Sequence, residues 1–353
     1  MIARYFGLAF LTLPVLFPSP APAGEPAVQF KLLSTLAPKE LPRGIGGGVH
    51  RLFFSPDGKV LAAHQDATVT TFWEVGTGKN LLLLEWQGAS SVAFSPDNKT
   101  FFFAEGGNSG SSVFKLYDLA TGKDLAKIDS FPGILRCLAM TRDGKTVATG
   151  GTGETIRLWD VASRKTVHLL NGHKERVNFL AFSHDGKTLA SASEDGVIKL
   201  WNVATGKEVN TVLVPGPLRS NINSGPCLAI SPDFKTLAWN VEKGNITVRD
   251  IASGKDLKPS PKHGDWSAGL AFSADGKWLA TAANGDPTIK VWDVASGKNL
   301  GAQKTGQKPF GTDGASRSCL AWSPAGPVLA SGGGPADATI KLWEIIPAEK
   351  APK

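Results

Sequence analysis

The stretch VNFLAFSHDGKTLASASEDGVIKLWNVATGK at residues 177–207 is one complete copy of a unit that recurs along the chain. It holds an apolar run, a Ser-x-Asp-Gly-Lys turn, a second run, and an Ile-Lys-Leu-Trp segment closed by Thr-Gly-Lys. Related turns begin at Ser55, Ser95, Thr141, Ser183, Ser231, Ser273 and Ser323. A unit that recurs in this way determines the architecture of the whole chain.

An aromatic residue near the end of each unit marks the period. It falls at Trp73, Tyr117, Trp159, Trp201, Trp292 and Trp343, with Arg249 in that slot of the fifth copy. Successive positions are 42 to 51 residues apart, which is typical of propeller blades and too long for ankyrin or leucine-rich repeats. Four short strands per copy make a blade, and blades must stack to bury their faces. We predict an all-β, seven-bladed propeller of four-stranded antiparallel blades.

The two ends of the chain supply the closure of the ring. The last copy has only three strands before a polar tail at residues 347–353. Residues 29–36, QFKLLSTL, match the outer strands of other copies and are predicted to complete the last blade. A single propeller domain is therefore expected at residues 24–346. The outer strand of the fifth copy contains Pro259 and Pro261, which an edge strand tolerates.

The N-terminus has the pattern of a signal peptide. Arg4 precedes an apolar run at residues 5–17, and Ala21-Pro22-Ala23 has the small-x-small form of a cleavage site. The run of 13 residues is shorter than the roughly 20 of a membrane-spanning helix. We expect residues 1–23 to be removed and the mature chain to be exported, periplasmic or secreted, without a transmembrane segment.

The cysteines and the charge indicate whether the protein has disulfides and whether it binds nucleic acid. Cys137, Cys227 and Cys319 occupy one slot in three alternate copies, so we expect buried free thiols and no disulfide. The formal net charge is +7, but twelve lysines lie in the two turns of the repeat, where the aspartates of the first turn offset them. Alternating charges in tight turns indicate a solvated rim and disfavour nucleic acid as a partner.

Four segments give the chain its family resemblance: LWDV at 158–161, LWNV at 200–203, VWDV at 291–294 and LWEI at 342–345. The chain resembles the WD-repeat (WD40) family of seven-bladed β-propellers over nearly all of its mature length. The resemblance implies a structural network of hydrogen bonds inside a blade. Its residues would be His173, Ser191, Asp195 and Trp201 in blade four, and His263, Thr281, Asp286 and Trp292 in blade six. Blade seven keeps Asp337 and Trp343 but lacks the histidine, and blades two, three and five depart further.

The same sets could be mistaken for a hydrolase triad. A catalytic set normally occurs once, whereas this one recurs at the blade spacing with a tryptophan partner. The Gly-Lys-Thr strings at Gly144 and Gly186 lie in hairpin turns and lack the upstream glycine of a phosphate loop. The six histidines do not have the spacing of a zinc site. We therefore expect no enzyme activity, no cofactor and no metal.

Extra length collects in four connections on the face opposite the lysine turns, at residues 105–112, 215–226, 301–316 and 331–338. Insertions gathered on one face of a repeat ring often mark a binding face, although neutral variation of surface loops gives the same pattern. Alignment of the blades places a mostly small ring at the channel mouth: Gly48, Gly88, Ile134, Arg176, Ser224, Trp266 and Ser316. Arginine and aromatic side chains dominate interaction hot spots, so the candidate interaction residues are Trp86, Arg176, Arg219, Trp266 and Phe310.

The resemblance implies a non-catalytic scaffold that binds a protein or peptide through the loop-rich face. We expect the propeller to be monomeric. Two alternatives stay open. One is a small-molecule or glycan binder that stacks its ligand on Trp266 and Trp86. The other is a propeller enzyme of lactonase or esterase type at the channel mouth, which would need metal-binding carboxylates and histidines where the aligned ring has none.

Overall fold

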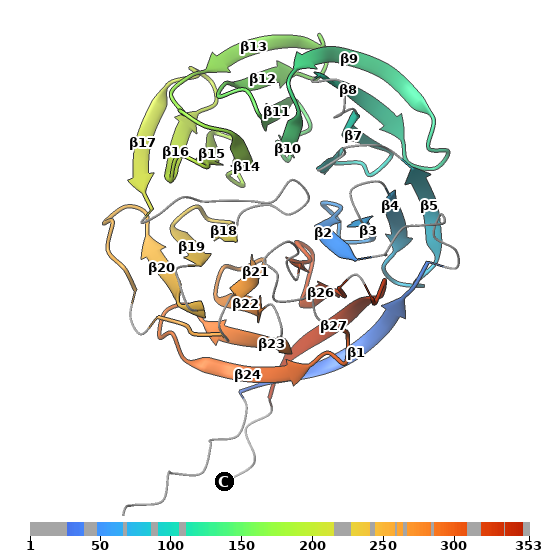
Figure 1. Cartoon of the computed structure of the whole chain (residues 1–353), viewed down its shortest axis with the longest axis vertical. Helices are drawn as coiled ribbons and strands as arrows, with labels where there is room; N and C mark the ends of the chain where they lie inside the picture. Colours follow the sequence, from blue (N-terminus) through green and yellow to red (C-terminus); the bar gives the residue numbers. More distant parts are fainter. Residues whose placement is uncertain are drawn as a thin grey trace, which may run out of the picture.

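The computed structural model describes residues 27–38, 48–65, 69–85, 91–105, 111–214, 227–240, 244–257, 260–263, 267–283, 286–308, 319–334 and 336–348. Seven antiparallel sheets surround a common centre (Figure 1). The predicted all-β, seven-bladed propeller is confirmed. The predicted signal peptide at residues 1–23 lies outside the described residues. Within the described ranges, no helix has the length and apolar character needed to cross a membrane.

Each blade runs from an inner strand at the centre of the ring to an outer strand at its rim. Blade one contains β2 (Val49–Phe54), β3 (Val60–Gln65), β4 (Val69–Glu74) and β5 (Asn80–Glu85). Blade two contains β6 (Val92–Phe94), β7 (Thr100–Glu105), β8 (Ser111–Asp118) and β9 (Asp124–Pro132). Blade three contains β10 (Leu135–Met140), β11 (Thr146–Gly151), β12 (Ile156–Asp160) and β13 (Lys165–Leu170).

The second half of the ring repeats this order. Blade four contains β14 (Val177–Phe182), β15 (Thr188–Ser193), β16 (Val197–Asn202) and β17 (Glu208–Leu213). Blade five contains β18 (Leu228–Ile230), β19 (Thr236–Asn240) and β20 (Ile246–Asp250). Blade six contains β21 (Ser267–Phe272), β22 (Trp278–Ala283), β23 (Asp286–Asp293) and β24 (Asn299–Lys304). Blade seven contains β25 (Leu320–Trp322), β26 (Val328–Gly332), β27 (Ile340–Pro347) and β1 (Val28–Leu36).

In blades one to six the first turn is built by a serine or threonine and an aspartate, whereas blade seven has Ala325 in the aspartate position. In blade one, Ser55 Oγ donates to Asp57 Oδ1 at 2.8 Å, and the same carboxylate accepts from Lys59 N at 3.0 Å. Gly58 completes the turn with a φ of 70°, which glycine adopts without a Cβ clash. These contacts satisfy the backbone of the turn locally, so the same short motif can form at the same edge of successive blades.

The core of the propeller lies between blades. Among the described residues there are seven hydrophobic clusters, and each joins two neighbouring blades. The cluster between blades seven and one packs Leu36 and Leu342 with Val49 and Trp73. Burial of apolar area between blades therefore stabilises the closed ring as a whole.

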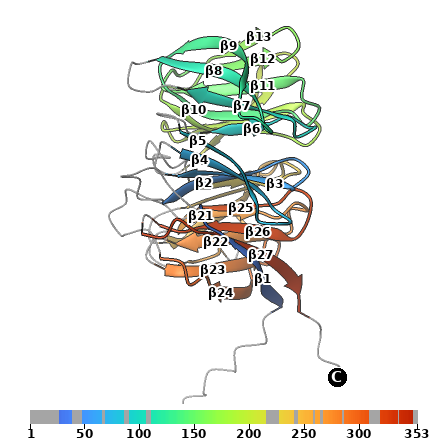
Figure 2. The same cartoon turned by 90° about the vertical axis from the view of Figure 1, so that its right-hand side faces the viewer.

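The N-terminal strand closes the ring as predicted. β1 pairs antiparallel with β27, and the register runs from Val28 opposite Pro347 to Leu36 opposite Ile340. Both views show the two strands side by side (Figures 1 and 2). β27 includes Pro347, so the strand reaches one residue into the segment that was assigned to the polar tail.

Among the described residues, the sheet of blade five has three strands, where four are predicted. In place of a fourth strand, the described residues make two isolated bridges, Asn245 with Lys262 and Arg249 with Asp256. The physical reason is in the sequence, since Pro259 and Pro261 have no N–H to donate to a ladder.

Candidate interaction face and blade networks

Blade four contains a buried chain of polar contacts between its strands and the segment before β14. His173 Nε2 lies 2.8 Å from Ser191 Oγ, and its Nδ1 lies 3.2 Å from Asp195 Oδ2. Trp201 Nε1 donates to the same Ser191 Oγ at 2.8 Å. The Asp195 carboxylate also accepts from Lys174 N at 3.0 Å, which ties the incoming segment to the blade.

The environment holds this histidine in its neutral form. Burial lowers the pKa of His173 below its usual value, although the Asp195 carboxylate partly opposes that effect. Burial raises the pKa of Asp195, but hydrogen bonds from Lys174 N and Val197 N outweigh it and leave that pKa below its usual value. A neutral imidazole beside an ionised carboxylate suits a fixed hydrogen-bond bridge.

Blade six has the same arrangement with the imidazole turned round. His263 Nδ1 lies 2.7 Å from Thr281 Oγ1, and Nε2 lies 3.5 Å from Asp286 Oδ2. Trp292 Nε1 donates to Thr281 Oγ1 at 2.9 Å. Burial, followed by the charge of Lys290, lowers the pKa of His263 to about 4. The four residues named from the sequence in each of these two blades are thus in mutual contact.

Blade seven uses a glutamine where these blades use histidine. Ser331 Oγ donates to Gln307 Oε1 at 2.8 Å, and Trp343 Nε1 donates to Ser331 Oγ at 3.0 Å. The residue after it, Lys308, donates from its backbone N to Asp337 Oδ2 at 2.9 Å, as Lys174 does to Asp195 in blade four. Sequence analysis missed Gln307 because a long connection separates it from β25; the Gln-Lys pair, parallel to His173-Lys174, was the available signal.

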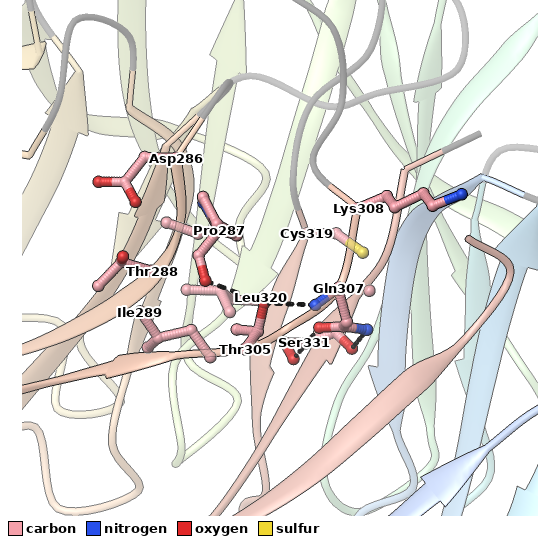
Figure 3. Close-up of a pocket in the computed structure, with 12 residues that line it drawn as sticks. Asp286, Pro287, Thr288, Ile289, Thr305, Gln307, Lys308, Cys319, Leu320 and Ser331 are labelled. Carbon is pink, nitrogen blue, oxygen red and sulfur yellow. Dashed lines mark hydrogen bonds between the residues drawn. The ribbon is translucent and has the colours of Figure 1, made fainter. Parts of the chain in front are cut away.

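A small cavity lies beside Gln307, between blades six and seven (Figure 3). Its lining includes Asp286, Thr305, Gln307 and Ser331, and its volume is about 20 Å³. A space of this size holds about one water molecule. We therefore regard it as part of the blade packing and not as a ligand site.

The tryptophan network is modified in the other described blades. Trp73 Nε1 donates to Thr71 on its own strand at 2.9 Å, and Trp159 Nε1 donates to Thr149 at 2.9 Å. In blade five the tryptophan has moved to β19, and the Arg249 guanidinium lies 4.9 Å from the centre of the Trp239 ring. A cation placed over an indole ring is attracted by the ring quadrupole, so Arg249 occupies the vacated aromatic slot with a favourable contact.

These blade contacts agree with comparison to known proteins. The family described as WD domain, G-beta repeat matches residues 125–160, 164–202, 257–293 and 310–344. The chain therefore contains WD40 repeats. A stretch of 85 residues is 40% identical to the anaphase-promoting complex subunit cdc20 of Dictyostelium discoideum. That match covers 24% of this chain and 16% of the relative, so the chain spans less than a fifth of the relative's length.

The predicted interaction residues of this WD40 protein are only partly placed by the structure. Arg176 is exposed on the connection that enters β14, and its backbone oxygen accepts from Glu194 N at 3.0 Å. The other four candidates, Trp86, Arg219, Trp266 and Phe310, lie outside the described residues. Gly48 and Ile134 of the aligned ring directly precede the inner strands β2 and β10.

The cysteines of the WD40 propeller pack between blades. All three are free and buried. Cys137 Sγ lies 3.3 Å from Val177 O in the next blade, and Cys319 Sγ lies 3.0 Å from Val49 O. Burial raises the pKa of both thiols to about 12. No group of three or more His, Cys, Asp or Glu side chains among the described residues is placed to hold a metal ion.

Proposed function

We propose that this WD40 protein is an exported, non-catalytic scaffold that binds a protein or peptide through the loop-rich face of its propeller. The observation that carries the proposal is the ring itself, in which seven inter-blade clusters join every blade to its neighbours among the described residues. Such a ring holds the ends of its strands at fixed positions, which suits recognition of a partner.

The chemistry of the polar sets supports a structural role. Ser191 is 0% exposed, and its Oγ already contacts His173 and Trp201. A serine nucleophile must reach a substrate and must surrender its proton to a base. The position of Ser191 inside the blade prevents that approach, and the same holds for Thr281, which is also 0% exposed.

The comparison supports the same type of function. The Dictyostelium relative is named as a subunit of a complex, and its similarity to this chain is confined to 85 residues. Together with the repeat family, this favours assembly with another protein as the role of the propeller. The proposed partner is a protein or peptide, the propeller itself acts as a monomer, and neither nucleic acid nor a cofactor is part of the proposal.

An affinity pull-down from the exported fraction of the native cell tests the binding face. The bait is the wild-type chain, compared with the double variant Arg176→Ala, Trp266→Ala and with a matched double variant of the opposite rim, Lys59→Ala, Lys145→Ala. Circular dichroism confirms that all three are folded. A protein retained by the wild type and the rim variant but lost by the first variant supports the proposal. Equal retention by all three baits contradicts it.

Export is tested separately, because the binding experiment does not depend on it. N-terminal sequencing of the protein recovered from the exported fraction is expected to begin at Gly24, after Ala21-Pro22-Ala23. A protein that stays in the cell and begins at Met1 or Ile2 contradicts this part of the proposal.

A further inference from the structure

The inner strands of the propeller share an irregularity at their starting end. In blades one, three, four and six the register skips the second residue of the inner strand: His50, Arg136, Asn178 and Ala268. A β-bulge of this kind redirects the side chain of the extra residue, and bulges are frequent beside functional sites. Blades one, three and four have large polar side chains at this position, namely His50, Arg136 and Asn178. The inner strands of these three blades are therefore polar at their starting end.

Two arginines meet at this end of the inner strands. Arg51, the third residue of β2, reaches past blade two and donates from Nη1 to the backbone oxygen of Arg136 on β10, at 3.0 Å. The route is open because the slot equivalent to Arg51 in blade two is occupied by the small Ser91. Ser91 is itself buried and accepts from Leu138 N of blade three at 3.1 Å. Arg51 therefore bridges two blades that are not neighbours.

Both guanidinium groups have unused donors. Arg136 is only 4% exposed, and neither its Nε nor the Nε of Arg51 has a hydrogen-bond partner within the part of the chain that the structure describes. Neither arginine forms an ion pair with a carboxylate among those residues. A buried charged donor without an acceptor lowers the free energy of unfolding. The presence of two such donors at one place therefore indicates a ligand that accepts their hydrogen bonds.

A third arginine and one carboxylate complete the charge of the cluster. The positive charge of Arg176, at the start of β14, acts on the Arg136 guanidinium, and the Glu194 carboxylate opposes it. Glu194 also accepts from Asn178 Nδ2 at 3.0 Å. Burial lowers the pKa of the nearby His64 to about 3, so this histidine is neutral. Among the described residues, three guanidinium groups against one carboxylate leave two positive charges.

We propose that Arg51, Arg136 and Arg176 form a binding site for a phosphate group at the centre of the propeller. A phosphate monoester carries about 1.5 to 2 negative charges at neutral pH, which matches the surplus of the cluster better than a single carboxylate does. Guanidinium groups are also suited to phosphate because their N–H donors pair with two oxygens at once. The cluster lies at the starting end of β2, β10 and β14, opposite the Ser-Asp turns. These three strands lie around the centre of the ring (Figure 1).

Isothermal titration calorimetry with inorganic phosphate, at constant ionic strength in sodium chloride, tests the site. The wild type is expected to bind phosphate and to gain thermal stability from it. Arg136→Met and Arg51→Met keep most of the side-chain volume and are each expected to weaken binding about 10-fold or more. The matched control is Arg142→Met, in the turn at the far end of β10, where Arg142 contacts His184 at 2.8 Å. It is expected to bind as the wild type does.

A variant of the exposed Arg176 can still test the site if the variants of Arg51 and Arg136 do not fold. Arg176→Ala removes a solvent-facing side chain, so weaker phosphate binding by this variant supports the site. Absence of binding heat and of thermal stabilisation in the wild type overturns the proposal, as does equal phosphate affinity in Arg136→Met and Arg142→Met. The experiment needs no protein partner, so the proposal stands apart from the scaffold function.

The source of the phosphate is resolved by two further probes. Phenyl phosphate represents a small phosphate monoester, and a phosphoserine pentapeptide, beside its unphosphorylated form, represents a modified chain. Tighter binding of the phosphopeptide than of inorganic phosphate assigns the site to a phosphorylated peptide. Tighter binding of phenyl phosphate assigns it to a small molecule. Either result supports a phosphate site, whereas binding of the unphosphorylated peptide with equal affinity contradicts it.

Discussion

Ser331 donates a hydrogen bond to Gln307 at 2.8 Å, in the place where Ser191 of blade four meets His173 at 2.8 Å. A glutamine in blade seven and a histidine in blade four thus make the equivalent contact with a serine. Each must hold the segment that enters the blade against the second strand, and each uses a buried acceptor beside the indole N–H of a tryptophan. A glutamine amide does not titrate in the range where an imidazole does. The blades should therefore respond differently to acid.

The neutral histidines make the stability of the propeller depend on pH. His263 has a pKa of about 4 in the folded chain, below the roughly 6.5 of an unfolded histidine. The unfolded chain binds the proton first, so stability is full above pH 6.5 and falls as pH drops toward 4. His263→Gln copies blade seven and should remove on the order of 3 kcal/mol from this loss. Urea midpoints at pH 7, 5.5 and 4.5 measure the difference.

The converse substitution is the control for that experiment. Gln307→His should make the wild-type slope between pH 6.5 and 4 steeper, because it adds a buried neutral imidazole. The same slope in the wild type and both variants would show that these histidines do not contribute to the acid sensitivity.

The hydroxyl of Ser191 should contribute to stability and not to catalysis. Ser191→Ala leaves the buried Trp201 Nε1 and one nitrogen of His173 without their partner. Loss of such a partner costs about 1–3 kcal/mol in the free energy of unfolding. Ser163→Ala, an exposed change in the turn after β12, should cost less than half of that. Equal urea midpoints for Ser191→Ala and the wild type would contradict the structural role.

Glycine is required at one end of β11 for steric reasons. A Cβ at Gly151 would overlap the backbone carbonyl of Ile134 in the adjoining strand segment. Gly151→Ala should therefore lower the free energy of unfolding by about 1–3 kcal/mol, as overpacking does elsewhere. A Cβ at Gly326 would meet no atom within 4 Å, so Gly326→Ala should leave stability within about 0.5 kcal/mol of the wild type. Thermal and urea unfolding of the pair compare the two sites directly.

The buried thiols should be inert in the folded protein. Their burial raises the pKa of Cys137 and Cys319 to about 12, and only a thiolate reacts with a disulfide reagent. Titration with Ellman's reagent should detect none of the three thiols in the native chain and all three after denaturation in guanidinium chloride. Rapid reaction of the native chain would contradict the packing of these residues between blades.

The closing strand should determine the cooperativity of the ring. Deletion of residues 27–36 removes β1, exposes the edge of β27 and takes Leu36 out of the cluster between blades seven and one. We expect a lower melting temperature, a broader transition and a tendency to associate through the free edge. Deletion of residues 349–353 should change none of these. Calorimetry and light scattering distinguish the two deletions.

Most of the fold was predictable because its signals are local. The turn of Ser55 and Asp57 makes its hydrogen bonds to residues at most five positions away. It can therefore be recognised in the sequence wherever it occurs. The network of His173 could also be named, because the resemblance to the WD-repeat family implies it. The outer strand of blade five was harder to predict, because the effect of Pro261 depends on which backbone groups of β20 face it.

The sequence by itself determined the number of blades, the strand that closes the ring and the burial of the cysteines, because period, turn chemistry and alternation act over short distances. Only the tertiary structure decided that Gln307 takes the histidine slot of blade seven and that Arg51 reaches Arg136, 85 positions along the chain. These contacts form between segments that ring closure brings together. Their geometry depends on the positions of neighbouring blades, and no local pattern carries that information.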